Sequence, residues 1–111
     1  MYFEHAKGLN SENKVIEYLQ RQGWRLLHHR FKTKIAEIDL IFQKGNQFRI
    51  IEVKSVASWD FVSYRVSKKQ KQRLIRVFHY FQQRFSLELT LELALVPRDG
   101  DILFIEIENE Y

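Results

Sequence analysis

The sequence contains no cysteine, which excludes disulfides, thiolate metal sites and cysteine nucleophiles. One proline and four glycines provide no flexible linker that would divide the 111 residues. No apolar run approaches the roughly 20 residues of a membrane-spanning helix. The charged residues near the start are also unlike a signal peptide. These absences favour one domain, residues 1–111, that lies in the cytoplasm and has no membrane partner.

The residues that are present are typical of a compact, mildly basic domain. Hydrophobic residues make up 45% of the chain and charged residues 29%, which indicates a globular chain rather than a disordered one. The formal net charge of +4 is compatible with a polyanionic partner such as nucleic acid. Many proteins with other partners have such a charge, so the positions of the charged residues matter more than their sum.

Periodicity and turn signals predict an α-β-β-β-α-β-β order, a mixed α/β sandwich. Asn10 or Ser11 could cap the first helix, and Gly23 is placed where helices commonly stop. Gly45-Asn46 marks a tight hairpin. The expected helices cover 10–22 and 67–85, and the expected strands cover 24–31, 35–43, 47–54, 87–97 and 102–108.

The hairpin fixes which side chains face each other. If Gly45 and Asn46 are the two loop residues, paired residues have numbers that add up to 91. Asp39 then lies opposite Glu52 on one face of the two strands, with Glu37 opposite Lys54. The other face is predicted to be core and carries Ile38, Leu40, Phe42, Ile51 and Val53.

Two facing carboxylates repel each other, so this pair does not stabilise a sheet. A divalent cation would turn the repulsion into attraction, and Mg²⁺ and Mn²⁺ prefer carboxylate and water oxygens. Lys54 would lie close enough to act on water or on phosphate charge. Acidic alternation is also common on solvated strands. The segment 105–108 has this alternation without a lysine, and we interpret it as facing solvent.

The ordered motif resembles a known superfamily. Ile38-Asp39-Leu40, a hairpin and then Ile51-Glu52-Val53-Lys54 resemble the PD-(D/E)xK nuclease motif. The match is closer to the bacterial YraN-like family, through the segments 8–12, 36–41, 51–55 and 68–74, in the same order and spacing over most of the chain. That family is similar in fold to archaeal Holliday-junction resolvases. The resemblance therefore implies a restriction-endonuclease-like sandwich with a central mixed sheet.

The resemblance also implies roles for individual residues. Asp39 and Glu52 would be metal ligands for Mg²⁺ or Mn²⁺, the Val53 carbonyl a further ligand, and Lys54 the catalytic lysine. Glu12 matches an acid on the first helix that would complete the metal site, directly or through water. The chain departs from the family pattern at positions that are usually basic or glycine, which are Leu9, Ser11, Ala36 and Val56.

Basic residues supply the predicted nucleic-acid contacts. They are concentrated around the start of the second helix, where phosphate contacts would give salt-dependent affinity without base reading. The predicted set is Lys34, Arg65, Lys68, Lys69, Lys71 and Arg73. The alternative is an ordinary solvated helix face. His28 and His29 are adjacent on a strand, point to opposite faces and should not share a metal.

Three functional hypotheses follow from the sequence. The first is a metal-dependent endonuclease that hydrolyses the phosphodiester bonds of nucleic acid, with branched or structured DNA as a substrate class. The second is a non-catalytic nucleic-acid-binding module that keeps the fold and the basic helix. The third is an interaction protein such as a homodimer, a state that the resemblance to dimeric resolvases also makes compatible with the first hypothesis.

Overall fold

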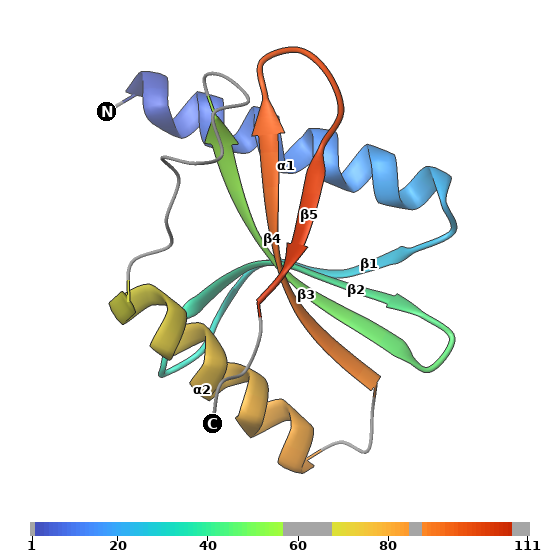
Figure 1. The fold of residues 1–111 in the computed structure, drawn as a ribbon, viewed down its shortest axis with the longest axis vertical. Helices are drawn as coiled ribbons and strands as arrows, with labels where there is room; N and C mark the ends of the chain where they lie inside the picture. The colour runs from blue at the N-terminus through green and yellow to red at the C-terminus, as the bar shows by residue number, and fades with distance from the viewer. Residues whose placement is uncertain (1, 57–67, 85–87, 108–111) are drawn as a thin grey trace.

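The structure is a computed structural model and describes residues 2–56, 68–84 and 88–107. Within these residues a twisted sheet lies between two helices, which cover its opposite faces (Figure 1). The elements are α1 (Tyr2–Arg21), β1 (Arg25–Lys32), β2 (Glu37–Lys44), β3 (Gln47–Val56), α2 (Lys68–Arg84), β4 (Glu88–Pro97) and β5 (Leu103–Glu106).

The five described strands lie in the sheet in the order of the sequence. The β3–β4 pair is parallel, because α2 connects the two strands, and the other neighbouring pairs are antiparallel. The predicted element order and the mixed central sheet are therefore confirmed. No helix among the described residues combines the length and the apolar character needed to span a bilayer.

The start of α1 was predicted wrongly. The helix begins at Tyr2, so Asn10 and Ser11 lie inside it and do not cap it. Helical structure continues through Gly8, which an interior helix position tolerates at a cost of about 1 kcal/mol relative to alanine. The earlier residues contain no proline that would stop the helix, and the two polar residues only resemble a cap.

The end of α1 follows the prediction. Gly23 has a φ of 91°, and its N–H donates to the Gln20 carbonyl at 3.0 Å. The N–H of Trp24 donates to the Leu19 carbonyl at 3.0 Å. These two bonds form a Schellman motif, in which the left-handed glycine satisfies the last helical carbonyls and turns the chain into β1.

Both faces of the sheet are packed. The α1 face is formed by the buried residues Val15, Leu19, Leu40, Phe42, Ile51, Ala94 and Val96. The α2 face is formed by the buried residues Ile38, Ile41, Ile50, Leu74, Ile75, Val77 and Leu91. The prediction placed Ile38 with Leu40, and this was wrong. Ile38 pairs with Phe31 of β1, beyond the last backbone pair of β2 with β3, and packs with Phe31 towards α2.

Candidate metal centre and nucleic-acid surface

The β2–β3 hairpin has the predicted register up to the candidate site and then opens. Backbone pairs run from Lys44 with Gln47 to Leu40 with Ile51, and each pair adds up to 91. Gly45 has a φ of 61°, as expected for a two-residue hairpin loop. The recorded ladder ends before Asp39, so the predicted backbone pairing of Asp39 with Glu52 is not formed.

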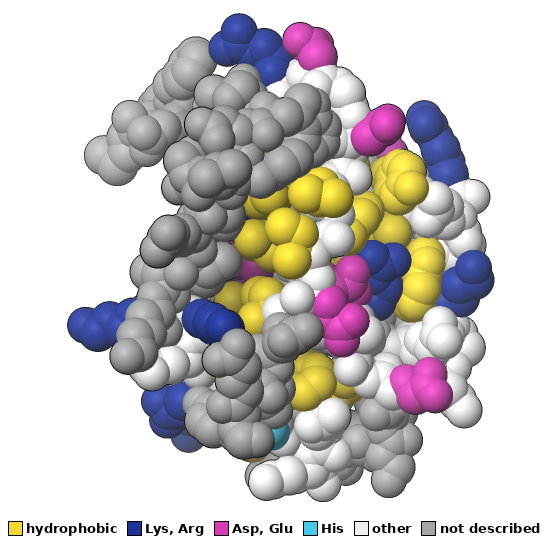
Figure 2. Space-filling view, viewed as in Figure 1, with side chains coloured by type: hydrophobic (Ala, Val, Ile, Leu, Met, Phe, Trp, Pro, Cys, Tyr) yellow, Lys and Arg dark blue, Asp and Glu magenta, His cyan; other side chains and the backbone are white. Residues whose placement is uncertain are grey.

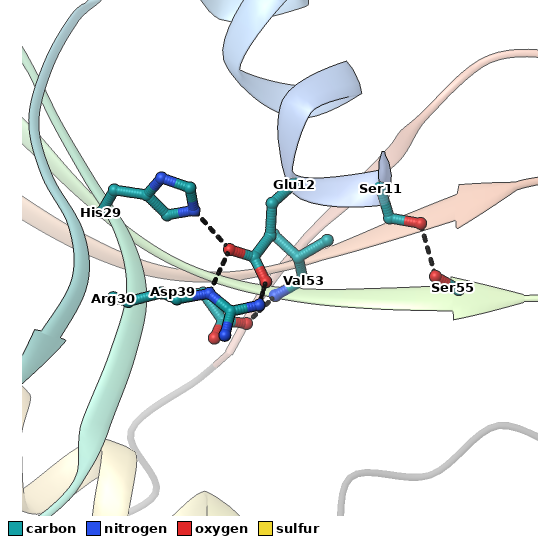
Figure 3. Close-up of polar contacts among 7 residues, drawn as sticks. All are labelled: Ser11, Glu12, His29, Arg30, Asp39, Val53 and Ser55. Carbon is teal, nitrogen blue, oxygen red and sulfur yellow. Dashed lines mark hydrogen bonds and ion pairs between the residues drawn. The ribbon is translucent and has the colours of Figure 1, made fainter. Parts of the chain in front are cut away.

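Beyond the last backbone pair of the ladder, the side chain of Asp39 connects β2 to β3. One of its carboxylate oxygens, Oδ2, accepts a hydrogen bond of 2.8 Å from the backbone N–H of Val53 (Figure 3). The aspartate therefore bridges two strands that have begun to separate. Its carboxyl also shares a hydrogen bond with that of Glu52, so the two acids meet through their side chains.

The acid pair is electrostatically costly. Glu52 is only 8% exposed, and Asp39 is half-buried. Burial, followed by the charge of Asp39 and the hydrogen bond with it, raises the pKa of Glu52 to about 9. Burial also raises the pKa of Asp39, although hydrogen bonds from Glu52 and from the Val53 N–H act in the opposite direction. The two carboxyls therefore hold a proton between them up to a higher pH than isolated carboxyls would.

Lys54 lies on β3 two residues beyond Glu52 and is half-buried. Its positive charge lowers the pKa values of both Asp39 and Glu52, although burial outweighs this effect. The structure thus brings together three of the predicted site residues. The predicted pairing of Glu37 with Lys54 is not formed, because the β2–β3 ladder ends at Leu40; Glu37 is exposed and lies opposite Lys32 of β1.

Glu12 approaches the acid pair from α1 and is held by two residues of β1 (Figure 3). His29 Nε2 lies 2.6 Å from Glu12 Oε1, and Arg30 donates to both carboxylate oxygens, at 3.3 Å from Nε and 3.1 Å from the terminal nitrogen. Glu12 is 5% exposed, and its charge raises the pKa values of Asp39 and Glu52. The third acid is thus close enough to act on the pair while it remains paired with cations.

Sequence reasoning missed Arg30 and the role of His29. Adjacent residues of a strand normally point to opposite faces, yet both side chains reach Glu12. Arg30 has a φ of 56°, in the left-handed region that arginine rarely adopts, and this breaks the alternation. No spacing in the sequence signals such a backbone. The prediction that the two histidines separate is confirmed, since His28 lines a cavity under α2 together with Phe31.

Ser11, an expected departure from the family pattern, has a contact of its own. Its hydroxyl forms a hydrogen bond with that of Ser55 on β3 (Figure 3). The bond ties α1 to β3, at the residue next to Glu12 on the helix and three residues beyond Glu52 on the strand. The substitution therefore supports the position of the acids without removing one of them.

The donor set fits a magnesium-type site with few protein ligands. Among the described residues there is no group of three or more Asp, Glu, His or Cys side chains arranged to hold a metal. Two carboxylates at one point nevertheless suit Mg²⁺ or Mn²⁺, because Mg²⁺ keeps several waters and is commonly bound through one or two carboxylates and a substrate phosphate. A cation would also replace the proton that the buried pair now shares.

The predicted basic residues have several settings. Lys34 is exposed in the turn between β1 and β2, Lys69 and Arg73 are exposed on α2, and Lys71 is half-buried there. Arg65 and the side chain of Lys68 lie outside the described residues. Basic side chains gather at the lower left of Figure 2, over the first half of α2. The first turn of α2 contains no acid, so its cations oppose the helix dipole, and a bound anion would offset this cost.

Solved structures share this fold. The structure of Hjc from Archaeoglobus fulgidus, a Holliday junction resolvase, matches 90% of this chain and 72% of its own with a TM-score of 0.71. The sequence identity is 18%, so the likeness concerns the fold. The predicted nuclease-like architecture is thereby confirmed.

Sequence relatives define the family. A UPF0102 protein of Rhodopseudomonas palustris is 40% identical over 68 residues, which are 61% of this chain and 52% of that protein, so the match spans about half of that relative. A UPF0102 protein of Caldicellulosiruptor saccharolyticus is 35% identical over 69% of this chain and 67% of its own. One from Campylobacter fetus is 27% identical over 84% and 83%. The model of the uncharacterised protein family UPF0102 matches residues 11–96, and the chain belongs to this family.

Proposed function

We propose that this protein is a divalent-metal-dependent endonuclease that hydrolyses phosphodiester bonds in DNA, with branched or otherwise structured DNA as its substrate class. The observation that carries the proposal is the Asp39–Glu52 pair. Two carboxyls are buried against each other at the point where two strands separate, an arrangement that costs folding free energy. Its cost is understandable if the pair exists to bind a cation.

Asp39, Glu52 and the Val53 carbonyl would hold Mg²⁺ or Mn²⁺, which when bound would polarise a phosphate oxygen and lower the pKa of a coordinated water. Asp39 uses Oδ2 for the Val53 N–H, so Oδ1 is the oxygen that it can offer. Glu52 must give up its proton to become a ligand. The first requirement follows from the hydrogen bond of Asp39 to the hairpin backbone, and the second from the raised pKa of Glu52.

Lys54 would act on the attacking water or on the phosphate of the substrate. It lies on the same strand as Glu52, and its positive charge already acts on both acids. An ammonium at this place can orient the attacking water or stabilise the charge that develops on the phosphate. Glu12 would assist through water or through its charge, because Arg30 and His29 occupy its oxygens.

The basic residues would bind the DNA backbone. Lys34, Lys69 and Arg73 are exposed, and none of the three forms an ion pair within the part of the chain that the structure describes. Arg65, Lys68 and Lys71 remain part of the proposed surface. Phosphate contacts of this kind place the backbone in the site and do not read sequence. A homodimer remains a prediction that light scattering of the purified protein would test.

The decisive test is Asp39→Asn, assayed on a four-way DNA junction and on single-stranded DNA with Mg²⁺ or Mn²⁺. The amide keeps the shape of the carboxyl but cannot offer a charged ligand. Cleavage should fall by more than the ~10–100-fold that loss of a supporting partner of a metal ligand costs. Glu106→Gln, an exposed acid on β5, is the matched control and should cut like the parent. Equal cleavage by Asp39→Asn and the parent would refute the assignment.

A second function, DNA binding without cleavage, is favoured by one observation. Both oxygens of Glu12 are paired with β1 cations, and the described residues form no three-acid metal group. This function predicts salt-sensitive DNA binding that is the same with and without metal. Cleavage by the parent protein that depends on Mg²⁺ or Mn²⁺ would exclude it.

A further inference from the structure

A groove lies between the β1–β2 turn and α2, outside the acid pair. Its volume is about 760 Å³, within the range of ligand-binding clefts. Lys32 and Lys34 form one side, and Tyr80 and Phe81 of α2 form the other, with Phe31 between them. We call this the turn groove.

The basic side of the turn groove is held in place before any ligand arrives. Thr33 Oγ1 accepts hydrogen bonds from the N–H groups of Ile35, at 3.1 Å, and Ala36, at 2.9 Å. The same hydroxyl donates to the Ala36 carbonyl at 2.7 Å, and the Thr33 N–H donates to this carbonyl at 3.0 Å. A turn fixed by four hydrogen bonds presents its lysines with little further loss of conformational entropy on binding.

The aromatic side offers exposed ring surface. Tyr80 is 45% exposed, and its ring centroid lies 5.8 Å from that of Phe81 in an edge-on arrangement. Phe81 in turn lies 6.3 Å from Phe31, at an angle of 41°. The two phenylalanines are half-buried and anchor the wall, so Tyr80 is the ring that a ligand can cover.

Lysines facing aromatic rings match the chemistry of an unpaired nucleotide. A base can stack on a ring while the flanking phosphates lie near ammonium groups, and such binding tolerates any sequence. Glu37 lies opposite Lys32 in the β1–β2 register and offsets part of its charge, so Lys34 is the stronger phosphate contact. The turn also leads directly into β2. Asp39 follows Ala36 by three residues, which is about 10 Å along an extended strand.

We propose that the turn groove binds one unpaired nucleotide of a DNA strand, with its base stacked on Tyr80 and a flanking phosphate on Lys34. The proposal deepens the proposed function and rests on it, because the groove would hold single-stranded DNA beside the strand that carries Asp39. The substrate class is then DNA with an unpaired segment next to the scissile bond.

The test is binding of a fluorescein-labelled thymidine oligomer of about twelve nucleotides, a length that one single-strand-binding surface covers. It is measured by anisotropy in EDTA, so that cleavage and metal play no part. An abasic oligomer of the same length keeps the phosphates and lacks the bases. Tyr80→Ala should weaken binding of the thymidine oligomer about five-fold or more and leave binding of the abasic oligomer unchanged. Tyr80→Phe should bind both oligomers like the parent.

Matched variants separate the two contacts. Tyr18→Ala removes a tyrosine of similar exposure, 42%, from α1 on the other face of the sheet, and should bind like the parent. Lys34→Ala should weaken the binding of both oligomers equally. It should also reduce the slope of log K against log salt concentration by about 0.7, the value for one phosphate contact on a single strand. Lys14→Ala, an exposed lysine of α1, should not change the slope.

Three results would overturn the proposal. The first is that Tyr80→Ala binds the thymidine oligomer as tightly as the parent does. The second is that Tyr80→Ala loses the same factor of affinity for both oligomers. The third is that the parent binds the thymidine and abasic oligomers with equal affinity. Far-UV circular dichroism of each variant verifies the fold. The assay contains no metal and no cleavage step, so a failure of the turn groove to bind the nucleotide can be distinguished from a failure of the Asp39→Asn cleavage test.

Discussion

Glu52→Gln should remove most of the dependence of stability on pH near neutrality. Burial against Asp39 raises the pKa of Glu52 from its ordinary 4.5 to about 9, so the folded protein holds a proton that the unfolded chain releases. Protonation of Glu52 makes its full contribution to the free energy of unfolding below the pKa of Glu52 in the unfolded chain. This contribution is lost as the pH rises through the pKa of Glu52 in the folded protein. Each pH unit between these values costs ~1.4 kcal/mol, so the free energy of unfolding should fall by up to roughly 2.7 kcal/mol from about pH 6 to about pH 8.

Glutamine at position 52 is neutral at both pH values, and its amide can donate a hydrogen bond to Asp39 as the protonated carboxyl does. Urea unfolding in EDTA at the two pH values gives the comparison, and Glu106→Gln on the exposed β5 strand controls for the loss of any glutamate. Mn²⁺ at the higher pH should stabilise the parent and not Glu52→Gln, because a bound ligand stabilises only a protein that can bind it. The same pH slope in the parent and in Glu52→Gln would refute the assignment of a shared proton.

Two further changes test the parts of the fold that hold the acids. Gly45→Ala should destabilise the protein by roughly 1–2 kcal/mol through backbone strain alone, because φ is 61° and no atom lies within 4 Å of the added Cβ; urea unfolding measures this, and a parent-like midpoint would contradict the turn geometry. Arg30→Ala should cost about 2 kcal/mol by leaving the buried Glu12 carboxylate with fewer partners. Glu12→Gln in the same chain should recover part of that loss, and strictly additive effects in the double-mutant cycle would show that the pair is not coupled.

The hairpin was predictable because its information is local. A two-residue loop at Gly45-Asn46 fixes the register, and the register determines which residues share a face. The register predicted that Asp39, Glu52 and Lys54 lie close together, and in the structure the three side chains interact although the predicted backbone pairing of Asp39 with Glu52 is absent. The end of the ladder at Leu40 could not be predicted, because there the Val53 N–H donates to the Asp39 side chain and not to a backbone carbonyl of β2.

The contacts between elements were less predictable for a physical reason. The partners of Glu12 come from β1, and they reach it because Arg30 adopts a left-handed backbone that no residue pattern encodes. The early start of α1 was missed because capping residues are recognised by type, and Asn10 and Ser11 have the right type inside a helix. The turn groove was also missed, since it joins β1 side chains to α2 rings from a distant segment.

The buried glutamates of the described residues show why the metal would enter at the acid pair. Glu92 is held by Arg49 at 2.7 Å and by Thr90 at 2.6 Å, and Glu12 is held by Arg30 and His29. Basic side chains of the same chain pair with these two acids, and a metal ion would have to displace those side chains. Glu52 instead faces a second carboxyl, and the charge of that pair is balanced by a proton that solvent can take back. A divalent cation can replace a proton without breaking an ion pair, so Asp39 and Glu52 are the acids that should exchange their proton for a metal ion. Glu12 should act on this pair through its charge while it stays paired with Arg30 and His29.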